Sequence, residues 1–253
     1  MTSGGESPTL CSSKPKNLGK CCFMIKAVLL DMGNTLIKYD VEVFEEVFHR
    51  ILLSLSIPKS LDDVKKAFLS AKIEAEDLDL LSFFGKMKCE EYWNRWDSLV
   101  LKHLGIAEHI ELGKIVQSKW FDFVDCTLHP EVEEVLSELK RRGLKIGIVS
   151  TAYEEEIHLI LEKADLDKAT FDIIVGVDTI RKAKPNPDVF KYAISKLNVK
   201  PEETIFVGDN VEADYKGAEN AGIHALLINR TEKKELSDLK TITNLKEILS
   251  QIN

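Results

Sequence analysis

The stretch KAVLLDMGNTLIK, residues 26–38, decides the predicted fold. Its first half is a short apolar run, which is typical of a strand buried on both faces of a parallel sheet. The run ends in one carboxylate, Asp31, and a Met-Gly-Asn-Thr turn follows. A carboxylate at the tip of a buried strand is a poor core residue but a good nucleophile or metal ligand. We therefore expect a functional site to begin at Asp31.

Strand-like and helix-like segments alternate regularly in the second half of the chain. Strand-like runs occupy residues 145–150, 171–177, 203–209 and 224–229, and amphipathic helical patterns occupy 129–143, 154–166, 186–199, 212–222 and 245–252. Such alternation is typical of a parallel sheet with helices on both faces. The predicted fold class is therefore α/β, with a Rossmann-like, doubly wound parallel sheet as its core.

A long, mostly helical block separates the first strand from the others. Within residues 41–124 the apolar side chains recur three and four positions apart, as on amphipathic helices. We predict an inserted α-helical domain over 41–124 and a core made of 24–40 and 125–253. Residues 1–23 are small and polar, and we expect a disordered N-terminal extension there.

Composition and charge exclude several classes of protein. The 253 residues are 44% hydrophobic and 30% charged, as in ordinary globular chains, and no apolar run approaches the roughly 20 residues of a membrane span. The net charge of -8 argues against a general nucleic-acid or anionic-membrane surface. The five cysteines lack disulfide or zinc spacing, which favours a cytoplasmic location. A monomer and a homodimer both remain open.

Polar residues gather where the predicted strands end. These residues are Asp31, Ser150, Thr151, Asp209 and Asp214, with Lys182 and Lys184 in the loop RKAKPNPDVF. Each alone has an ordinary explanation, such as a helix cap or a solvated loop. At one edge of a parallel sheet they form a set that suits phosphoryl transfer: a nucleophile, hydroxyl donors, a cation and oxygen ligands for Mg²⁺.

Four motifs make the likeness to a known family specific. They are DMGNT at 31–35, IVS at 148–150, the lysine before proline in KAKPNPDVF, and GDNVEAD at 208–214. With these motifs the chain resembles the haloacid dehalogenase superfamily over residues 25–228. Most members of that superfamily are Mg²⁺-dependent phosphatases, and the helical insertion falls where their helical cap lies. A cap that closes over the site implies a small phosphorylated metabolite as substrate.

The resemblance implies a role for each site residue. Asp31 would be the nucleophile and a metal ligand, and Lys184, which precedes proline as Lys182 does not, would bridge nucleophile and phosphate. Ser150 would hydrogen-bond the phosphoryl group, and Thr151 would contact substrate. The expected Mg²⁺ ligands, direct or through water, are Asp31, the backbone carbonyl of Gly33, Asp209 and Asp214.

Gly33 departs from the family pattern, which has an acid/base aspartate two residues after the nucleophile. Three interpretations follow. The first is a phosphatase of acyl phosphates or phosphoric monoesters whose leaving group needs little protonation, as in an acyl phosphate, an aryl phosphate or a sugar 1-phosphate. The second is a 2-haloacid dehalogenase or a phosphonate hydrolase. Only the phosphonate hydrolase would need a cap lysine, such as Lys86 or Lys88. The third is a non-catalytic or weakly active protein that binds a phosphorylated ligand.

Two further expectations concern the insertion and the loop that leads into it. Asp40 lies in that loop and is a candidate replacement for the missing acid, although a solvated loop carboxylate is the simpler interpretation. The aromatic stretch LSFFGKMKCEEYWNRW, residues 81–96, holds the candidate selectivity residues. In it we expect Phe83, Phe84 and Tyr92 to belong to the cap core, and Trp93 and Trp96 to pack between helices.

Overall fold

The computed structural model describes residues 24–38, 44–230 and 238–252. The N-terminal extension and Asp40 lie outside this part of the chain. Within it no helix is long and apolar enough to cross a membrane. The strands are β1 (Ala27–Leu30), β2 (Ile37–Lys38), β3 (Thr127–Leu128), β4 (Lys145–Val149), β5 (Ile173–Val175), β6 (Thr204–Gly208), β7 (His224–Ile228) and β8 (Thr241–Ile242).

Six of these strands form one parallel sheet in the order β5-β4-β1-β6-β7-β8. All five predicted strands are present, at the centre and on both sides of this sheet. β8 was not predicted, because its two residues are too short to give an apolar pattern. β1 lies between β4 and β6, so that Leu30 pairs with Ile148 on one side and Val207 on the other. The doubly wound order is confirmed.

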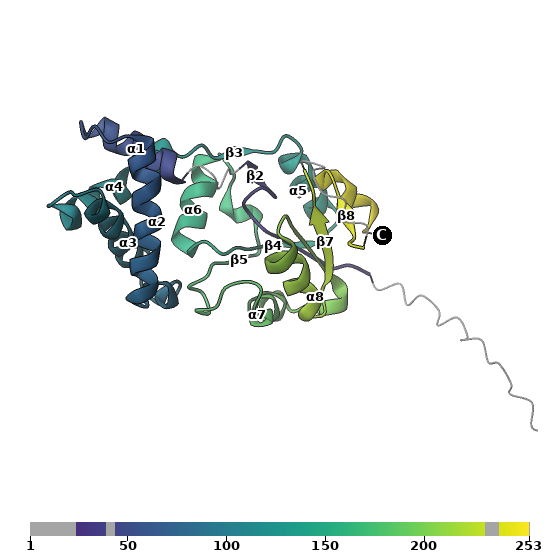
Figure 1. Cartoon of the computed structure of the whole chain (residues 1–253). Coiled ribbons are helices and arrows are strands. Elements are labelled where there is room, and N and C mark those ends of the chain that lie inside the picture. Colours follow the sequence, from purple (N-terminus) through teal and green to yellow (C-terminus); the bar gives the residue numbers. More distant parts are fainter. Residues whose placement is uncertain (1–23, 39–43, 231–237, 253) are drawn as a thin grey trace, which may run out of the picture.

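Helices cover both faces of the sheet (Figure 1). On one face Val28 and Leu30 of β1 pack with α5 (Val132–Arg141) and α6 (Glu154–Lys163). On the other face Ala27 and Leu29 pack with α7 (Pro187–Leu197) and α8 (Gly217–Asn220). All four β1 side chains are fully buried. This alternation explains why the strand reads as a continuous apolar run.

Two predicted helices differ in type from the α-helices expected. Residues 212–222 begin as a π-helix, Val211–Lys216, in which the N–H groups of Asp214 and Tyr215 both donate to Asn210 O. Asp214 lies within this wider turn, and single π-helical turns often occur at functional sites. The last predicted helix is a 3₁₀ helix, Leu245–Ser250, capped by Asn244. This helix ends two residues earlier than predicted, and a segment this short gains little from α-helical hydrogen bonds.

Residues 44–123 form a separate group of helices at one side of the sheet (Figure 1). They are α1 (Phe44–Ser54), α2 (Leu61–Asp77), a 3₁₀ helix (Leu80–Phe83), α3 (Cys89–His103) and α4 (His109–Phe123). Phe48 packs edge-on against Phe68, with ring centroids 5.2 Å apart, and Phe68 packs against Trp96 at 6.2 Å. The predicted packing role of Trp96 is confirmed.

A short antiparallel ribbon connects the helical group to the sheet. β2 leaves the end of β1 and pairs with β3, which follows α4, with Ile37 opposite Leu128 and Lys38 opposite Thr127. Two-residue strands carry no readable period, and the sequence did not predict this ribbon.

Candidate active site

Asp31 and Ser150 lie at the carboxyl ends of the neighbouring strands β1 and β4. The Asp31 N–H donates to Val207 O at 2.8 Å, and the Ser150 N–H donates to Val175 O at 2.9 Å, so each residue is tied to an adjacent strand. Both residues are buried, at 7% exposure. The Ser150 Oγ accepts a hydrogen bond from the Ala152 N–H at 3.2 Å, which fixes its direction. The next residue, Thr151, is exposed.

Lys184 joins two of the predicted carboxylates. Its Nζ lies 2.6 Å from Asp31 Oδ1 and 2.6 Å from Asp214 Oδ1, and its side chain is only 2% exposed. Burial acts to lower the pKa of Lys184, but the attraction of the two carboxylates raises it above its ordinary value, so the amine stays charged. Lys182, the alternative, pairs instead with Asp188 on the surface.

Asp31, Asp209 and Asp214 bring one carboxylate oxygen each to within 4.8 Å of one another. Burial, opposed by Lys184 and helped by Asp214, raises the pKa of Asp31 above its usual range. Burial and the Asp214 charge also raise the pKa of Asp209. Carboxylates that repel each other in this way are stabilised by a divalent cation. Three oxygen donors with room for water fit Mg²⁺, which prefers such ligands.

Gly208 leaves the space that Asp214 occupies. A Cβ on Gly208 would lie 2.4 Å from both Cγ and Oδ2 of Asp214, closer than real atoms approach. The Asp214 Oδ2 accepts the Asn210 N–H at 3.0 Å, so the carboxylate is held on the side away from Lys184 as well. Position 208 must therefore be glycine for Asp214 to occupy its place beside Lys184.

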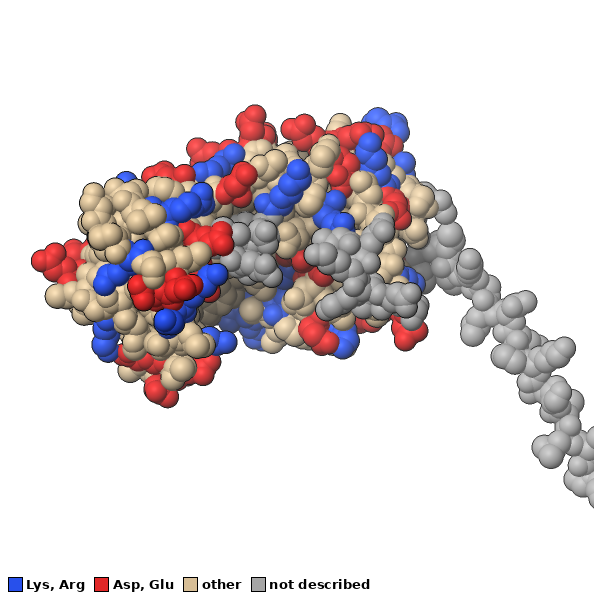
Figure 2. Space-filling model, turned by 45° about the horizontal axis from the view of Figure 1, so that its top comes forward, with Lys and Arg blue, Asp and Glu red and all other residues tan. Residues whose placement is uncertain are grey.

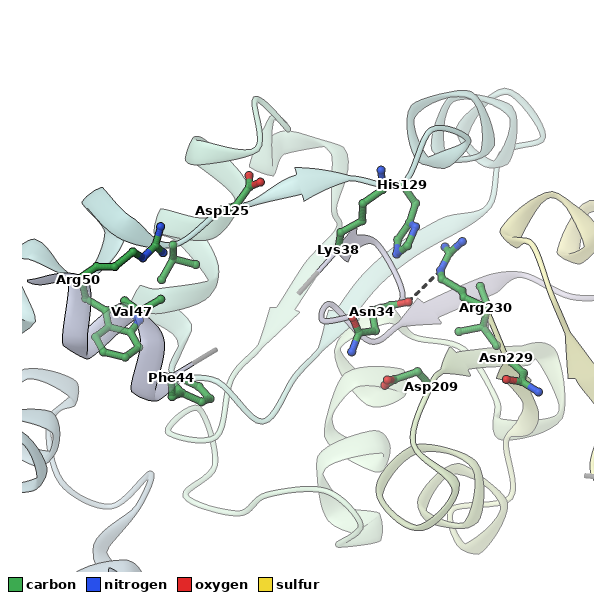
Figure 3. A pocket seen from close by; sticks show the side chains of 13 residues that line it. Asn34, Lys38, Phe44, Val47, Arg50, Asp125, His129, Asp209, Asn229 and Arg230 are labelled. Atoms are coloured by element: carbon green, nitrogen blue, oxygen red, sulfur yellow. Dashed lines mark hydrogen bonds between the residues drawn. The ribbon is translucent and has the colours of Figure 1, made fainter. Parts of the chain in front are cut away.

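The turn after Asp31 supplies further polar groups. The Thr35 hydroxyl donates to Asp31 Oδ2 at 3.3 Å, and the Thr35 N–H donates to the carbonyl of Gly33 at 2.6 Å. Asn34 has a positive φ of 52°, which asparagine tolerates better than most residues. Its side chain hydrogen-bonds Asp209, and the two lie side by side in Figure 3. The sequence predicted no role for Asn34 or Thr35, although the Gly33-Asn34 pair is a recognisable turn signal shortly after Asp31.

A cavity of about 660 Å³ lies between this turn and the helical group. Figure 3 shows Asn34, Asp209 and Arg230 on its sheet side, with Phe44, Val47 and Arg50 of α1 across from them. Its volume is in the range of small-molecule sites. Its lining residues are Asn34, Lys38, Phe44, Val47, Arg50, Trp120, Val124, Asp125, His129, Asp209, Ile228, Asn229 and Arg230. On the face seen in Figure 2, acidic and basic side chains are interspersed.

The helical group also contacts the core through an aromatic cluster. Phe84 and Tyr92 pack against Tyr153, with ring centroids 5.1 Å and 6.1 Å from it, and the Gly85 N–H donates to the Tyr153 hydroxyl at 2.9 Å. Burial raises the pKa of Tyr153 to about 12. These rings therefore bridge the two parts of the chain. Phe83 was expected in the same core but is 44% exposed, because its short 3₁₀ helix turns it outward.

Other predicted residues lie outside this site. Lys86 and Lys88, the candidate cap lysines of a phosphonate hydrolase, are exposed and do not line the cavity. The described cysteines, Cys89 and Cys126, are free thiols. His129 is partly buried and borders the cavity; burial and the nearby Arg230 lower its pKa to about 4. It is therefore neutral at pH 7.

Comparison with known proteins agrees with this arrangement. Residues 25–222 match the family model of haloacid dehalogenase-like hydrolases. The pyrophosphatase PpaX of Bacillus mycoides is 34% identical over 175 residues, which cover 61% of this chain and 80% of that protein. PpaX of Bacillus anthracis strain A0248 is 37% identical over 147 residues, covering 53% and 67%. The chain belongs to the haloacid dehalogenase-like hydrolase family, and it is a hydrolase.

Solved structures share the fold. A 2-haloacid dehalogenase from Pseudomonas syringae pv. Tomato superimposes with a TM-score of 0.70 at 21% identity, covering 90% of this chain and 99% of that one. The putative hydrolase YfnB from Bacillus subtilis, bound to magnesium, gives 0.66 at 22%, covering 91% and 99%. A phosphatase of the family from Thermococcus onnurineus gives 0.63 at 24%, covering 90% and 98%. These likenesses support the Rossmann-like core.

Proposed function

We propose that the chain is a Mg²⁺-dependent phosphatase that acts on a small phosphorylated metabolite in the cytoplasm. The observation that carries the proposal is the buried Lys184 bridge between Asp31 and Asp214, with Asp209 beside them. Taking a lysine and two carboxylates out of water costs desolvation free energy that their mutual attraction need not offset. Buried clusters of this kind are concentrated at functional sites. Residues 41–124 would serve as the cap, over a core of 24–40 and 125–253.

In this proposal Asp31 attacks the phosphorus with a carboxylate oxygen. The new O–P bond forms as the bond to the leaving group breaks, and the leaving group takes the electron pair. Lys184 and the Ser150 hydroxyl hold the phosphoryl oxygens, and Thr151 contacts the rest of the substrate. Asp31, the Gly33 carbonyl, Asp209 and Asp214 would hold Mg²⁺, which supplies charge neutralisation on the phosphoryl group. A water oxygen then bonds to the phosphorus as the Asp31 O–P bond breaks, Asp31 leaves with the electron pair as a carboxylate, and the proton of the water goes to the released phosphate or to solvent.

Gly33 sets the kind of leaving group that suits this site. Without a side chain it donates no proton, so the departing oxygen must leave as an anion. Acyl phosphates, aryl phosphates and diphosphates have such leaving groups, whereas alkyl phosphates do not. The named activity of the PpaX relatives, a pyrophosphatase, belongs to this class. The basic Lys38 and Arg50 at the cavity also suit a leaving group that carries its own negative charge.

Steady-state hydrolysis tests the proposal. Acetyl phosphate, p-nitrophenyl phosphate, pyrophosphate and glycerol phosphate are compared with Mg²⁺ and with EDTA. We expect turnover of the first three that requires Mg²⁺ and is lost in Asp31→Asn. Gly33→Asp should raise the rate on glycerol phosphate by about 10²–10⁴-fold, the usual worth of general acid catalysis. Gly33→Asn, of the same size but without an acid, is the matched control and should give no such rise.

Two further measurements on the same variants test the other interpretations. With a 2-haloacid as substrate, release of halide without Mg²⁺ would identify a dehalogenase. Tight binding of phosphate with no turnover, in the wild type and in Gly33→Asp alike, would identify a binding protein.

A further inference from the structure

Arg230 connects the end of β7 to the turn that follows Asp31. Its Nε donates to Asn34 O at 2.9 Å and its Nη2 donates to Thr35 O at 2.6 Å, across a sequence separation of 196 and 195 residues. The first of these bonds is the dashed line in Figure 3. The Arg230 side chain is 15% exposed. A planar guanidinium that bonds two successive carbonyls fixes the orientation of both peptide planes.

Glu131 holds the third nitrogen of this guanidinium. Arg230 Nη1 lies 2.7 Å from Glu131 Oε1, and the same oxygen accepts the Leu245 N–H at 3.3 Å. Glu131 is 5% exposed. Burial acts to raise the pKa of Glu131, but the bond from Arg230 and the backbone N–H groups keep it below the usual value. The carboxylate therefore stays charged and holds the arginine in one place.

The turn needs such a restraint because of its own sequence. Gly33 has more backbone freedom than any other residue would, and Asn34 is in the left-handed region. The same turn contains the Gly33 carbonyl, the Asn34 side chain on Asp209, and the Thr35 hydroxyl on Asp31. The next carbonyl, Leu36 O, accepts the His129 N–H at 3.0 Å. The site's geometry thus depends on groups that lie outside the four motifs.

We propose that Arg230, held by Glu131, is a positioning residue for the active site. It fixes the carbonyls of Asn34 and Thr35, and through them the Asn34–Asp209 contact and the direction of the Gly33 carbonyl. Each of its three nitrogens donates to a protein oxygen, two of them to the turn itself, so the guanidinium is held against the turn although it also borders the cavity. The inference rests on the proposed function only in assigning this turn to the metal and phosphoryl site.

The test compares Arg230→Gln and Arg230→Lys with a matched control, Arg142→Gln. Arg142 makes the same kinds of contact away from the site: Nε to Glu138 Oε1 at 2.8 Å, and Nη1 to Leu249 O at 2.8 Å and to Ile252 O at 3.1 Å. Mg²⁺ binding to each full-length variant is measured by calorimetry, alongside kcat, KM and the melting temperature. The binding measurement does not depend on turnover.

We expect Arg230→Gln to weaken Mg²⁺ binding and to lower kcat by about 10–100-fold each, with KM changed less than about 3-fold, as for groups that orient metal ligands. Arg230→Lys should recover part of both, because one ammonium can bond a single carbonyl. Glu131→Gln should act in the same direction, and the double variant should be no worse than Arg230→Gln. Arg142→Gln should lower the melting temperature without changing Mg²⁺ binding or kcat.

Two results would overturn the inference. If Arg230→Gln raises KM while Mg²⁺ binding and kcat stay at wild-type values, Arg230 binds substrate. If Arg230→Gln and Arg142→Gln differ only in melting temperature, the contact is structural. Weakened Mg²⁺ binding in Arg230→Gln, in a protein that hydrolyses none of the four phosphates, would support the positioning role and reject the proposed function.

Discussion

Lys184 Nζ lies 2.6 Å from Asp31 Oδ1, although 153 positions separate the two residues in the chain. The contact is made at the sheet edge, where the loop before α7 crosses the end of β1. Because both groups are buried, neither can exchange its partner for water without a large cost. We therefore expect the pair to determine both the stability of this sheet edge and the protonation of Asp31, the proposed nucleophile.

Lys184→Met should unmask the repulsion between the carboxylates. Removing one partner of a buried pair costs about 3–5 kcal/mol in free energy of unfolding, and loss of a cation from the phosphoryl site should lower kcat by about 10²–10³-fold. Mg²⁺ should then raise the melting temperature more than in wild type, because no lysine competes for the carboxylates. Thermal melts with and without Mg²⁺ measure this; Lys182→Met, at the surface pair with Asp188, should behave as wild type.

Gly208→Ala should disrupt the metal site through one methyl group. The added Cβ would overlap Asp214 and push it from Lys184 and from the other carboxylates. We expect Mg²⁺ affinity, measured by calorimetry, to fall about 10–100-fold. Gly105→Ala has free space around its Cβ and a φ of +73°, so it should cost only about 1–2 kcal/mol of backbone strain and leave Mg²⁺ affinity intact. Equal Mg²⁺ affinities in the two variants would contradict the steric argument.

Tyr153→Phe should loosen the contact between the cap and the core. The buried Gly85 N–H loses its acceptor, which costs about 1–3 kcal/mol in free energy of unfolding. Gly85→Ala should cost more, since its Cβ would lie 2.6 Å from Val177 Cγ2 at a φ of +72°. Urea unfolding measures both. An unchanged midpoint in Tyr153→Phe would show that water or another group replaces the hydroxyl.

Glu156→Gln should change how stability depends on pH. Burial, aided by the charges of Asp178 and Glu155, raises the pKa of Glu156 from 4.5 to about 7, while in the unfolded chain the group ionises near 4.5. The folded state therefore loses stability as pH rises between these values, and the loss is complete above pH 7. The variant lacks this loss, so its advantage over wild type should grow to about 1–3 kcal/mol at pH 8.

Urea unfolding at pH 5, 6, 7 and 8 tests this expectation. The variant can still accept the Tyr153 N–H that Glu156 Oε2 holds at 2.9 Å, so the hydrogen bond is kept. Glu162→Gln, at an exposed position of α6 and not among the charges that act on Glu156, is the control and should leave the pH profile unchanged. Parallel profiles for wild type and Glu156→Gln would mean that the carboxyl is ionised in the folded protein.

Much of the sheet and of the site was predictable because the signals are local. Buried parallel strands read as apolar runs, and their carboxyl ends place Asp31, Ser150 and Asp209 at one edge. The preference for Lys184 over Lys182 rested on the following proline. In the structure Lys184 is the one that reaches Asp31.

What the sequence missed depends on contacts between distant segments. Arg230 follows β7 in an ordinary context, and only the place where that strand ends brings it to Asn34. Phe83 and Phe84 are adjacent and equally apolar, but the tight turn of a 3₁₀ helix exposes the first and buries much of the second. Sequence periodicity does not separate such neighbours.

The β2–β3 ribbon has a consequence for how this protein can change. Because Lys38 pairs with Thr127, the chain leaves the sheet and returns to it at one spot. The helices α1 to α4 therefore form an insertion between β2 and β3. This insertion can be shortened, lengthened or exchanged without shifting the register of any strand in the six-stranded sheet. Selection can then alter what is admitted to the cavity while leaving the reacting groups untouched.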